Sequence, residues 1–253
     1  MKFLRSWKSI FVLVLLAIWV YCLIANKDVT NSVIASGMRF GMPLALASMV
    51  GIMCERSGVI NIGIEGTMLI SGFAGFWVAA NSRSVFVGVL AAIATGALTS
   101  LLHAMMTIRW KMDQIIAGTI INIMASGLTS FLYREGITIP NNWPIFDIPI
   151  LSKIPILGPE FFSQQGPIQY FGLILIPAIW IMLFKTRWGL RTRSVGENPG
   201  SADTAGVSVI RMRMTNVIIG GAIGGLVGSF ICLELVGSFS KEFTAGAGFT
   251  ALA

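Results

Sequence analysis

The chain has 253 residues, of which 55% are hydrophobic and only 11% are charged, and its mean hydropathy is +0.81. This composition excludes an ordinary soluble domain and indicates an integral membrane protein. The formal net charge of +7 does not indicate nucleic-acid binding, because the lysines and arginines lie in short connections between apolar segments and form no patch interleaved with aromatic residues.

Apolar segments long enough to cross a membrane recur along the whole chain. A helix of about 20 mostly apolar residues spans a hydrocarbon core roughly 30 Å thick. The sequence therefore predicts an all-α fold, a polytopic transmembrane helical bundle in a single domain over residues 1–253. We expect seven spans, at residues 9–25, 33–53, 64–80, 85–107, 114–133, 168–184 and 215–236.

Positive charge is divided unevenly between the two sides of this bundle. With a cytoplasmic N-terminus, the inner segments hold twelve lysines and arginines, the outer segments hold five, and Arg39 falls inside the second span. Cytoplasmic loops carry such an excess, so we expect the N-terminus inside. The first span also fits a signal peptide, but the bulky Trp19 and Tyr21 near the cleavage point favour a retained helix.

The connection between the second and third spans, CERSGVINIGIEGT at residues 54–67, keeps several apolar residues and three glycines. Irregular backbone at membrane depth is tolerated only where protein or a water-filled cavity covers it. We interpret the segment as an inner gate in which Asn61 and Glu65 supply polar groups to a path, while Glu55 and Arg56 mark the cytoplasmic boundary. The alternative is a tightly packed cytoplasmic turn whose charges lie among the headgroups.

Arg39 and two long connections complete this map. Arg39 either snorkels outward or faces the bundle interior as part of the path. The outer loop, residues 134–167, carries six of the nine prolines, and it is either a passive linker or a docking rim with Trp143 and Phe146 as contacts. The inner segment, residues 185–214, is the most polar stretch of the chain.

This inner segment contains the signals of a short helix. Asn198 can cap free amide groups, Pro199 suits the first helical position, and Gly206 can end the helix in a left-handed conformation. Such a surface helix is placed to meet a partner or anionic headgroups, and the alternative is a solvated loop held near lipid by its arginines. In the last span, Gly220, Gly224 and Gly228 recur at four-residue intervals and predict a close-packing face.

Motifs for chemistry are missing from the sequence. The single histidine, His103, has no second histidine with which to form a metal site or proton relay, so we expect neither catalytic nor metal-binding residues. The phosphate-binding pattern GxxxxGK[ST] is also absent. If ATP drives this protein, another subunit supplies the ATPase, and ATP with Mg²⁺ is bound there.

Two separated motifs carry a resemblance. CERSGVINIGIEGTMLISGF, preceded by Arg39 and Pro43, and RTRSVGENPGSADTAGVSVIRMR resemble the permease subunits of bacterial ATP-binding-cassette importers of the type II kind, in the branch that takes up nucleosides and simple sugars. GAGFTALA resembles a stretch that leads into further spans in that family, so the chain is similar to a C-terminally truncated member. The resemblance extends from about Ser36 onward and is specific for the family but not for a substrate.

The resemblance implies a non-enzymatic transport subunit in a bacterial plasma membrane. Its implied partners are a cytoplasmic ATP-binding subunit, a second permease chain that is homologous or identical, an extracytoplasmic substrate-binding lipoprotein and the lipid bilayer. It also implies that a coupling segment contacts the ATPase through Gly196, Glu197, Asn198, Pro199, Asp203 and Gly206.

Other functions remain open from the residues alone. An ion-gradient-driven secondary transporter or channel needs an intramembrane acid, for which Glu65 and Glu234 are the candidates. An intramembrane enzyme has no supporting constellation of residues. A structural subunit without its own path would tolerate apolar replacement of Asn61 and Glu65.

Overall fold

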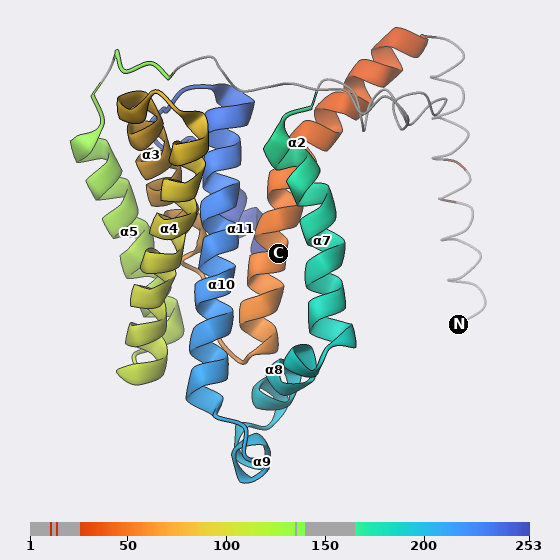
Figure 1. Ribbon diagram of the computed structural model, residues 1–253, viewed down its shortest axis with the longest axis vertical. Coiled ribbons are helices and arrows are strands. Elements are labelled where there is room, and N and C mark those ends of the chain that lie inside the picture. The colour runs from red at the N-terminus through yellow and green to blue at the C-terminus, as the bar shows by residue number, and fades with distance from the viewer. Residues whose placement is uncertain (1–10, 12–13, 15–25, 135, 140–164) are drawn as a thin grey trace. The chain divides into compact units, whose positions relative to one another are not determined.

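The structure is a computed structural model of the chain, and it describes residues 11, 14, 26–134, 136–139 and 165–253. Within these ranges the regular elements are helices (Figure 1). Their bounds are α2 (Lys27–Arg56), α3 (Ile64–Ser82), α4 (Val85–Ala104), the π-helix η1 (Met105–Arg109), α5 (Gln114–Leu132), α7 (Pro167–Lys185), α8 (Arg187–Glu197), α9 (Pro199–Thr204), α10 (Val209–Ser229), the π-helix η2 (Phe230–Val236) and α11 (Ala247–Leu252).

The helices agree with an all-α membrane protein that crosses the bilayer several times. Five of the described helical stretches are long and apolar enough to cross a membrane: Ser32–Arg56, Val85–Arg109, Gln114–Leu132, Pro167–Lys185 and Val209–Val236.

The expected seven spans are not confirmed. The expected span at residues 9–25 lies outside the described residues apart from Phe11 and Val14. α3 is helical where the third span is expected but is not among the five candidates, and it begins with polar and small residues and is largely buried by its neighbours. The final helix also starts six residues earlier than residue 215.

The chain divides into two compact units, residues 1–40 with 146–165 and residues 41–145 with 166–253. Most of the expected site residues belong to the second unit, whereas Arg39 belongs to the first. Residues 140–164 of the outer loop lie outside the described residues, so the docking rim with Trp143 and Phe146 stays a prediction.

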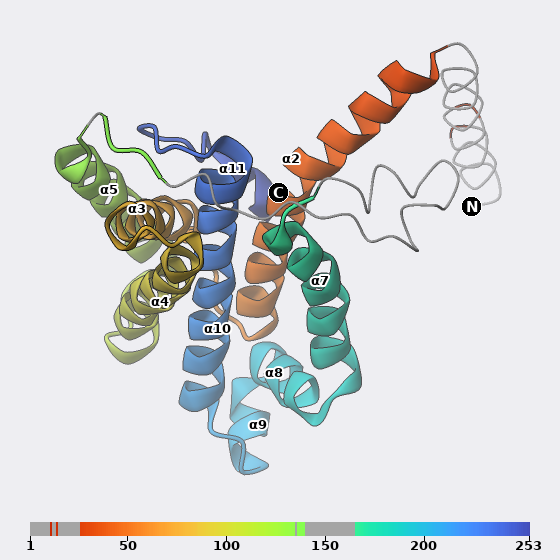
Figure 2. The ribbon, with the colours of Figure 1, turned by 45° about the horizontal axis from the view of Figure 1, so that its top comes forward.

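α3, α4 and α10 form the centre of the second unit and pack against one another (Figure 2). Glycines allow this packing, as the last span predicts. A methyl group on Gly96 of α4 would lie 2.7 Å from the Cα of Gly225 and would overlap the carbonyl oxygen of Gly221, both in α10. A methyl group on Gly228 would likewise overlap a carbonyl oxygen of α3, that of Met68. The helices therefore meet backbone to backbone, a close approach that small residues permit.

The remaining helices surround this centre. α5 packs on α3, and α11 also contacts α3. The second half of α2 lies against α10, where Gly220 faces Val50 and Cys54, and against α7, where Gly172 faces Leu46 and Met42. α8 and α9 follow α7 at one end of this unit (Figure 1).

Candidate functional site

The irregular segment between α2 and α3 is present where the sequence predicts it. The N–H of Gly58 donates to the carbonyl of Glu55 at 2.9 Å, and the N–H of Val59 donates to the carbonyl of Cys54 at 3.1 Å. Gly58 has φ +80°, the left-handed conformation in which glycine ends helices. The glycine therefore stops α2 and turns the chain back toward the bundle.

Side chains of α5 replace the helical hydrogen bonds that this segment lacks. The N–H of Ile60 donates to Oε1 of Gln114 at 2.6 Å. Asn122 bridges two backbone groups, because its Oδ1 accepts from the N–H of Gly66 at 2.8 Å and its Nδ2 donates to the carbonyl of Ile62 at 3.1 Å. Irregular backbone in an apolar protein requires such partners.

Asn61 turns the chain into α3. It is only 1% exposed, its Oδ1 accepts from the N–H of Gly63 at 3.0 Å, and its Nδ2 lies 4.0 Å from Sγ of Cys54. Gly63 in turn lies against α5, where a methyl group on Gly118 would come 2.8 Å from its nitrogen. Asn61 lines neither of the two cavities described below, and a contact with a transported molecule stays a prediction.

Glu65, in the first turn of α3, holds the N-terminal end of α11. Its Oε1 accepts from the hydroxyl of Thr244 at 2.5 Å and from the N–H of Gly246 at 2.9 Å, while Oε2 accepts from the N–H of Gly248 at 2.6 Å. A carboxylate is favourable at a helix N-terminus, where amide groups lack helical partners. A methyl group on Gly248 would come 2.6 Å from the nitrogen of Glu65, so glycine permits this contact.

A cavity of about 600 Å³ opens beside Glu65, between α3, α5 and the chain from residue 241 to α11. Its walls combine hydrogen-bonding groups with apolar surface, including the half-exposed ring of Phe249. Small-molecule sites have this mixed character. The polar residues in the walls are Glu65, Asn122, Ser126, Lys241, Glu242 and Thr244.

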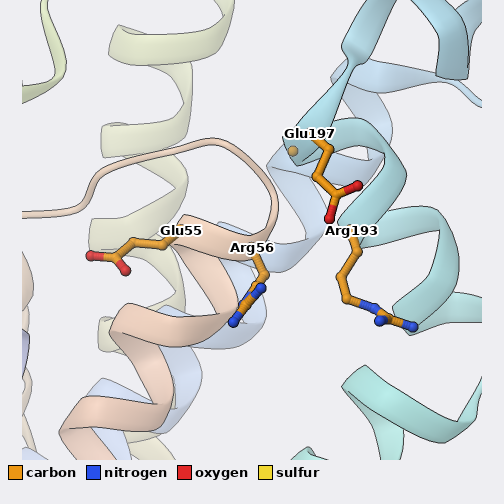
Figure 3. Close-up of a pocket in the computed structure, with 5 residues that line it drawn as sticks. Glu55, Arg56, Arg193 and Glu197 are labelled. Atoms are coloured by element: carbon orange, nitrogen blue, oxygen red, sulfur yellow. The ribbon is translucent and has the colours of Figure 1, made fainter. Parts of the chain in front are cut away.

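A second, smaller pocket of about 150 Å³ lies at the end of the bundle that carries α8 (Figure 3). Its lining residues are Glu55, Arg56, Arg193, Gly196 and Glu197. Gly196 packs directly on the end of α2, since a methyl group there would overlap the carbonyl oxygen of Arg56. The structure thus brings Glu55 and Arg56, which are expected at the cytoplasmic boundary, next to Gly196 and Glu197, which begin the expected coupling segment.

Two side chains of α10 fix α8 and the irregular segment at this end. Nε of Arg213 donates to the carbonyl of Ser57 at 3.1 Å. Asn216 is fully buried, and it accepts from Nε1 of Trp188 at 3.2 Å and donates to the hydroxyl of Thr192 at 3.1 Å. α8 is therefore tied to α10 by a buried polar network.

The short helix expected in the inner segment is confirmed as α9. The side chain of Asn198 accepts from the N–H of Ser201 at 3.0 Å, and Pro199 is the first helical residue. Gly206 has φ +81°, and its N–H donates to the carbonyl of Asp203 at 2.9 Å. Apart from the buried Ala202, α9 and its flanking residues from Glu197 to Gly206 are exposed.

The remaining expected site residue, Arg39, lines neither of the two cavities, and the structure adds other polar residues. Arg39 is exposed on the first part of α2, in the other compact unit. Sequence reasoning missed Gln114, Asn122, Asn216 and Thr244, which stand at the start of an apolar run, inside one or in a glycine-rich stretch. Within the described ranges, no three His, Cys, Asp or Glu side chains are grouped so that they could hold a metal ion.

The comparison with protein families gives one match that covers most of the chain. Residues 33–253 match the family described as branched-chain amino acid transport system / permease component. No solved structure matches the chain at a significant level.

Characterised relatives agree with this match. The chain is 36% identical over 232 residues to the nucleoside ABC transporter permease protein NupC of Lactococcus lactis, covering 87% of this chain and 73% of the relative. It is 38% identical over 238 residues to the guanosine ABC transporter permease protein NupQ of Bacillus subtilis, covering 89% and 75%. It is also 34% identical over 218 residues to the putative glucose ABC transporter permease protein TsgC13 of Haloferax volcanii, covering 83% and 65%. The chain belongs to the branched-chain amino acid transport system / permease component family and is a multi-pass transport subunit of the ABC permease type.

Proposed function

We propose that this permease subunit forms the path for a nucleoside in an ATP-driven importer. The observation that carries the proposal is the similarity, over most of the chain, to permeases named for nucleosides and guanosine. A simple sugar is the second candidate substrate, because a third relative is named as a putative glucose permease.

The cavity beside Glu65 supports a nucleoside as the substrate. A nucleoside combines sugar hydroxyls with a planar, partly apolar base. The cavity offers hydrogen-bonding side chains at Ser126, Lys241 and Glu242 and an aromatic ring at Phe249. Its volume of about 600 Å³ lies within the range of small-molecule sites.

The exposed helix α9 supports coupling to a separate ATPase. α9 directly follows α8. Hydrogen bonds of Asn216 link α8 to α10, and Gly196 of α8 packs on the end of α2. In this assembly a cytoplasmic ATP-binding subunit, with ATP and Mg²⁺, receives α9 in a groove, a helix-in-groove contact. A second permease chain completes the path, and a substrate-binding lipoprotein delivers the nucleoside. The positive charge near α8 supports a cytoplasmic position for this end and, with the uneven charge of the sequence, for the N-terminus.

The gradient-driven alternative needs Glu65 or Glu234 as a proton or ion carrier. Both carboxylates instead accept backbone hydrogen bonds at helix N-termini. Glu234 accepts from the N–H groups of Ile168 at 2.9 Å and Gln169 at 3.2 Å in the first turn of α7, and Glu65 does the same at α11. These bonds support structural roles for the two acids and favour ATP-driven import.

Uptake of radiolabelled guanosine by cells that express the chain with its neighbouring subunits tests the proposal. We expect uptake to stop on ATP depletion and to survive collapse of the proton and sodium gradients. A mild-detergent pull-down of the tagged chain should recover an ATPase subunit and a lipoprotein, identified by mass spectrometry. Uptake that follows the ion gradient and a chain recovered alone would support the gradient-driven alternative.

The double variant Asn198→Ala, Pro199→Ala tests coupling through α9. It replaces the capping residue and the proline at the first helical position, at a local cost of about 1 kcal/mol, and leaves Gly196 in place because a side chain there would overlap Arg56. We expect guanosine uptake to fall more than about tenfold, equivalent to 1.4 kcal/mol, while ATP hydrolysis and membrane insertion persist. Ser240→Ala, at an exposed serine far along the chain, is the control. Unchanged uptake in the double variant contradicts the assignment.

A further inference from the structure

The end of α7 carries a cluster of cations around aromatic rings. The guanidinium carbons of Arg56 and Arg193 lie 5.8 Å and 5.4 Å from the ring centre of Phe184. One turn away, Nζ of Lys185 lies 5.7 Å from the ring centre of Trp180. These distances are within the range of cation–π contacts, so the rings hold the cations in place.

The sequence of α7 places this cluster at the surface of the membrane. α7 is one of the candidate membrane spans, and it ends at Lys185, next to Phe184. Aromatic rings and lysine or arginine side chains gather where a span leaves the hydrocarbon core. Arg56 is likewise the last residue of the candidate span in α2. Both arginines therefore lie at the depth of the lipid headgroups.

The two acidic side chains of the small pocket are not both directed toward its arginines. Figure 3 shows the side chain of Glu55 turned away from the two guanidinium groups, while Glu197 lies on their side. In addition, Nε of Arg193 is buried without a hydrogen-bond partner. A buried donor without a partner costs free energy unless a ligand accepts its hydrogen bond.

From this arrangement we propose that the pocket lined by Arg56 and Arg193 binds the phosphate of an anionic phospholipid. A volume of about 150 Å³ admits a phosphodiester group. One guanidinium group can donate two parallel hydrogen bonds to two phosphate oxygens, which makes arginine suited to this ligand. The site is separate from the cavity beside Glu65 and does not depend on the transported substrate.

Apolar surface beside the pocket favours a lipid over a soluble anion or an acidic group of a protein. Trp180 and Ile181, within the last two turns of α7, are 51% and 50% exposed. Acyl chains of a lipid whose headgroup occupies the pocket lie along this surface, whereas a free phosphate or a carboxylate has no use for it. An apolar surface next to a basic pocket at a span end is typical of headgroup sites.

Native mass spectrometry on the full chain with its associated subunits tests this site. The protein is placed in nanodiscs of phosphatidylcholine with an added fraction of phosphatidylglycerol, and lipid retention is titrated. The variants are Arg56→Gln with Arg193→Gln, the charge-conserving pair Arg56→Lys with Arg193→Lys, and Arg109→Gln as a matched control. Arg109 also ends a candidate span and is exposed, but it does not line the pocket.

We expect the glutamine pair to weaken phosphatidylglycerol binding about 30-fold, about fivefold for each arginine, because each basic residue near an anionic surface adds about 1 kcal/mol. The lysine pair should lie between the glutamine pair and the unchanged protein, and Arg109→Gln should bind like the unchanged protein. The proposal is overturned if the glutamine pair binds phosphatidylglycerol as tightly as the unchanged protein, or if the unchanged protein retains phosphatidylcholine as well as phosphatidylglycerol. It is also overturned if inorganic phosphate at matched concentration displaces the lipid, or if the glutamine pair loses the ATPase subunit without losing lipid.

Discussion

Two polar regions interrupt this apolar chain, and they use their polar groups differently. In the irregular segment between α2 and α3, called the break below, side chains from α5 and α10 hydrogen-bond to the backbone. In α9, the polar residues satisfy only their own short helix and otherwise face outward. The first region is held from within, and the second is presented to the outside. The difference teaches that a polar residue in a membrane protein is assigned a role by its partners and not by its polarity alone.

The largest effect on stability should come from removing the hydrogen bonds that hold the backbone of the break. Asn122→Leu leaves the N–H of Gly66 and the carbonyl of Ile62 without their partner, and each unpaired group costs about 1 to 3 kcal/mol. We expect a clear fall in the thermal unfolding temperature of the detergent-purified chain and in its membrane yield. Ser126→Ala, one turn along α5 in the wall of the same cavity, is the control and should be close to neutral.

An equal response of the Asn122 and Ser126 variants would break the comparison. It would show that the hydrogen bonds of Asn122 do not hold the segment, and the difference between the two regions would then rest on exposure alone.

An intermediate effect is expected at the contact between α3 and α11. Glu65→Gln keeps one acceptor oxygen but directs an amide donor at the donor groups of residues 244–248, so at least one of the bonds from Thr244, Gly246 and Gly248 is lost. We expect a loss of stability of about 1 to 3 kcal/mol, together with reduced guanosine uptake. Glu242→Gln, at an exposed residue of the same cavity, serves as the control for charge.

These two variants also distinguish a structural role of Glu65 from a path role. If Glu65→Gln lowers uptake at unchanged stability, Glu65 acts on the transported molecule. If stability and uptake fall together while Glu242→Gln leaves stability unchanged, Glu65 acts by holding α11.

The smallest effect on stability is expected at the outward region, α9. Gly206→Ala places a side chain at φ +81°, which costs about 1 to 2 kcal/mol locally. Because α9 packs little against the bundle, we expect its end to fray, a modest fall in uptake and no change in thermal unfolding of the membrane part. Gly200→Ala is the matched control, since the added methyl group meets nothing closer than Oδ1 of Asn198, at 3.5 Å. A large fall in thermal stability for Gly206→Ala would show that α9 is part of the folded core.

Local signals in the sequence were sufficient for much of the fold. The cap and proline at the start of α9, its terminal glycine, and the glycine repeat of α10 act over a few residues, and the structure confirms them. The lengths of α4, α5 and α7 follow from apolar runs that end at polar residues. Helix type and helix ends are decided within a turn or two, so they can be read directly.

The partners of Asn61 and Glu65 could not be read in this way. The groups that hold Glu65 lie 179 to 183 residues further along the chain, and Gln114 and Asn122 meet the break from 54 to 60 residues away. Nothing in the local sequence names such contacts. Sequence reasoning therefore identified the irregular segment but had no means of separating residues that support its backbone from residues that line a path.

The glycine contacts between α3, α4 and α10 have a mechanical consequence. Where the backbones meet directly, as at Gly96 with Gly221 and Gly225, a tight fit leaves little room for one helix to slide past another. We therefore expect the three helices to move together as one rigid body. Because the buried Asn216 joins α8 to α10, a displacement of α8 is carried along the length of α10, about 30 Å. We therefore expect a displacement that begins at α9 to reach the opposite end of α10.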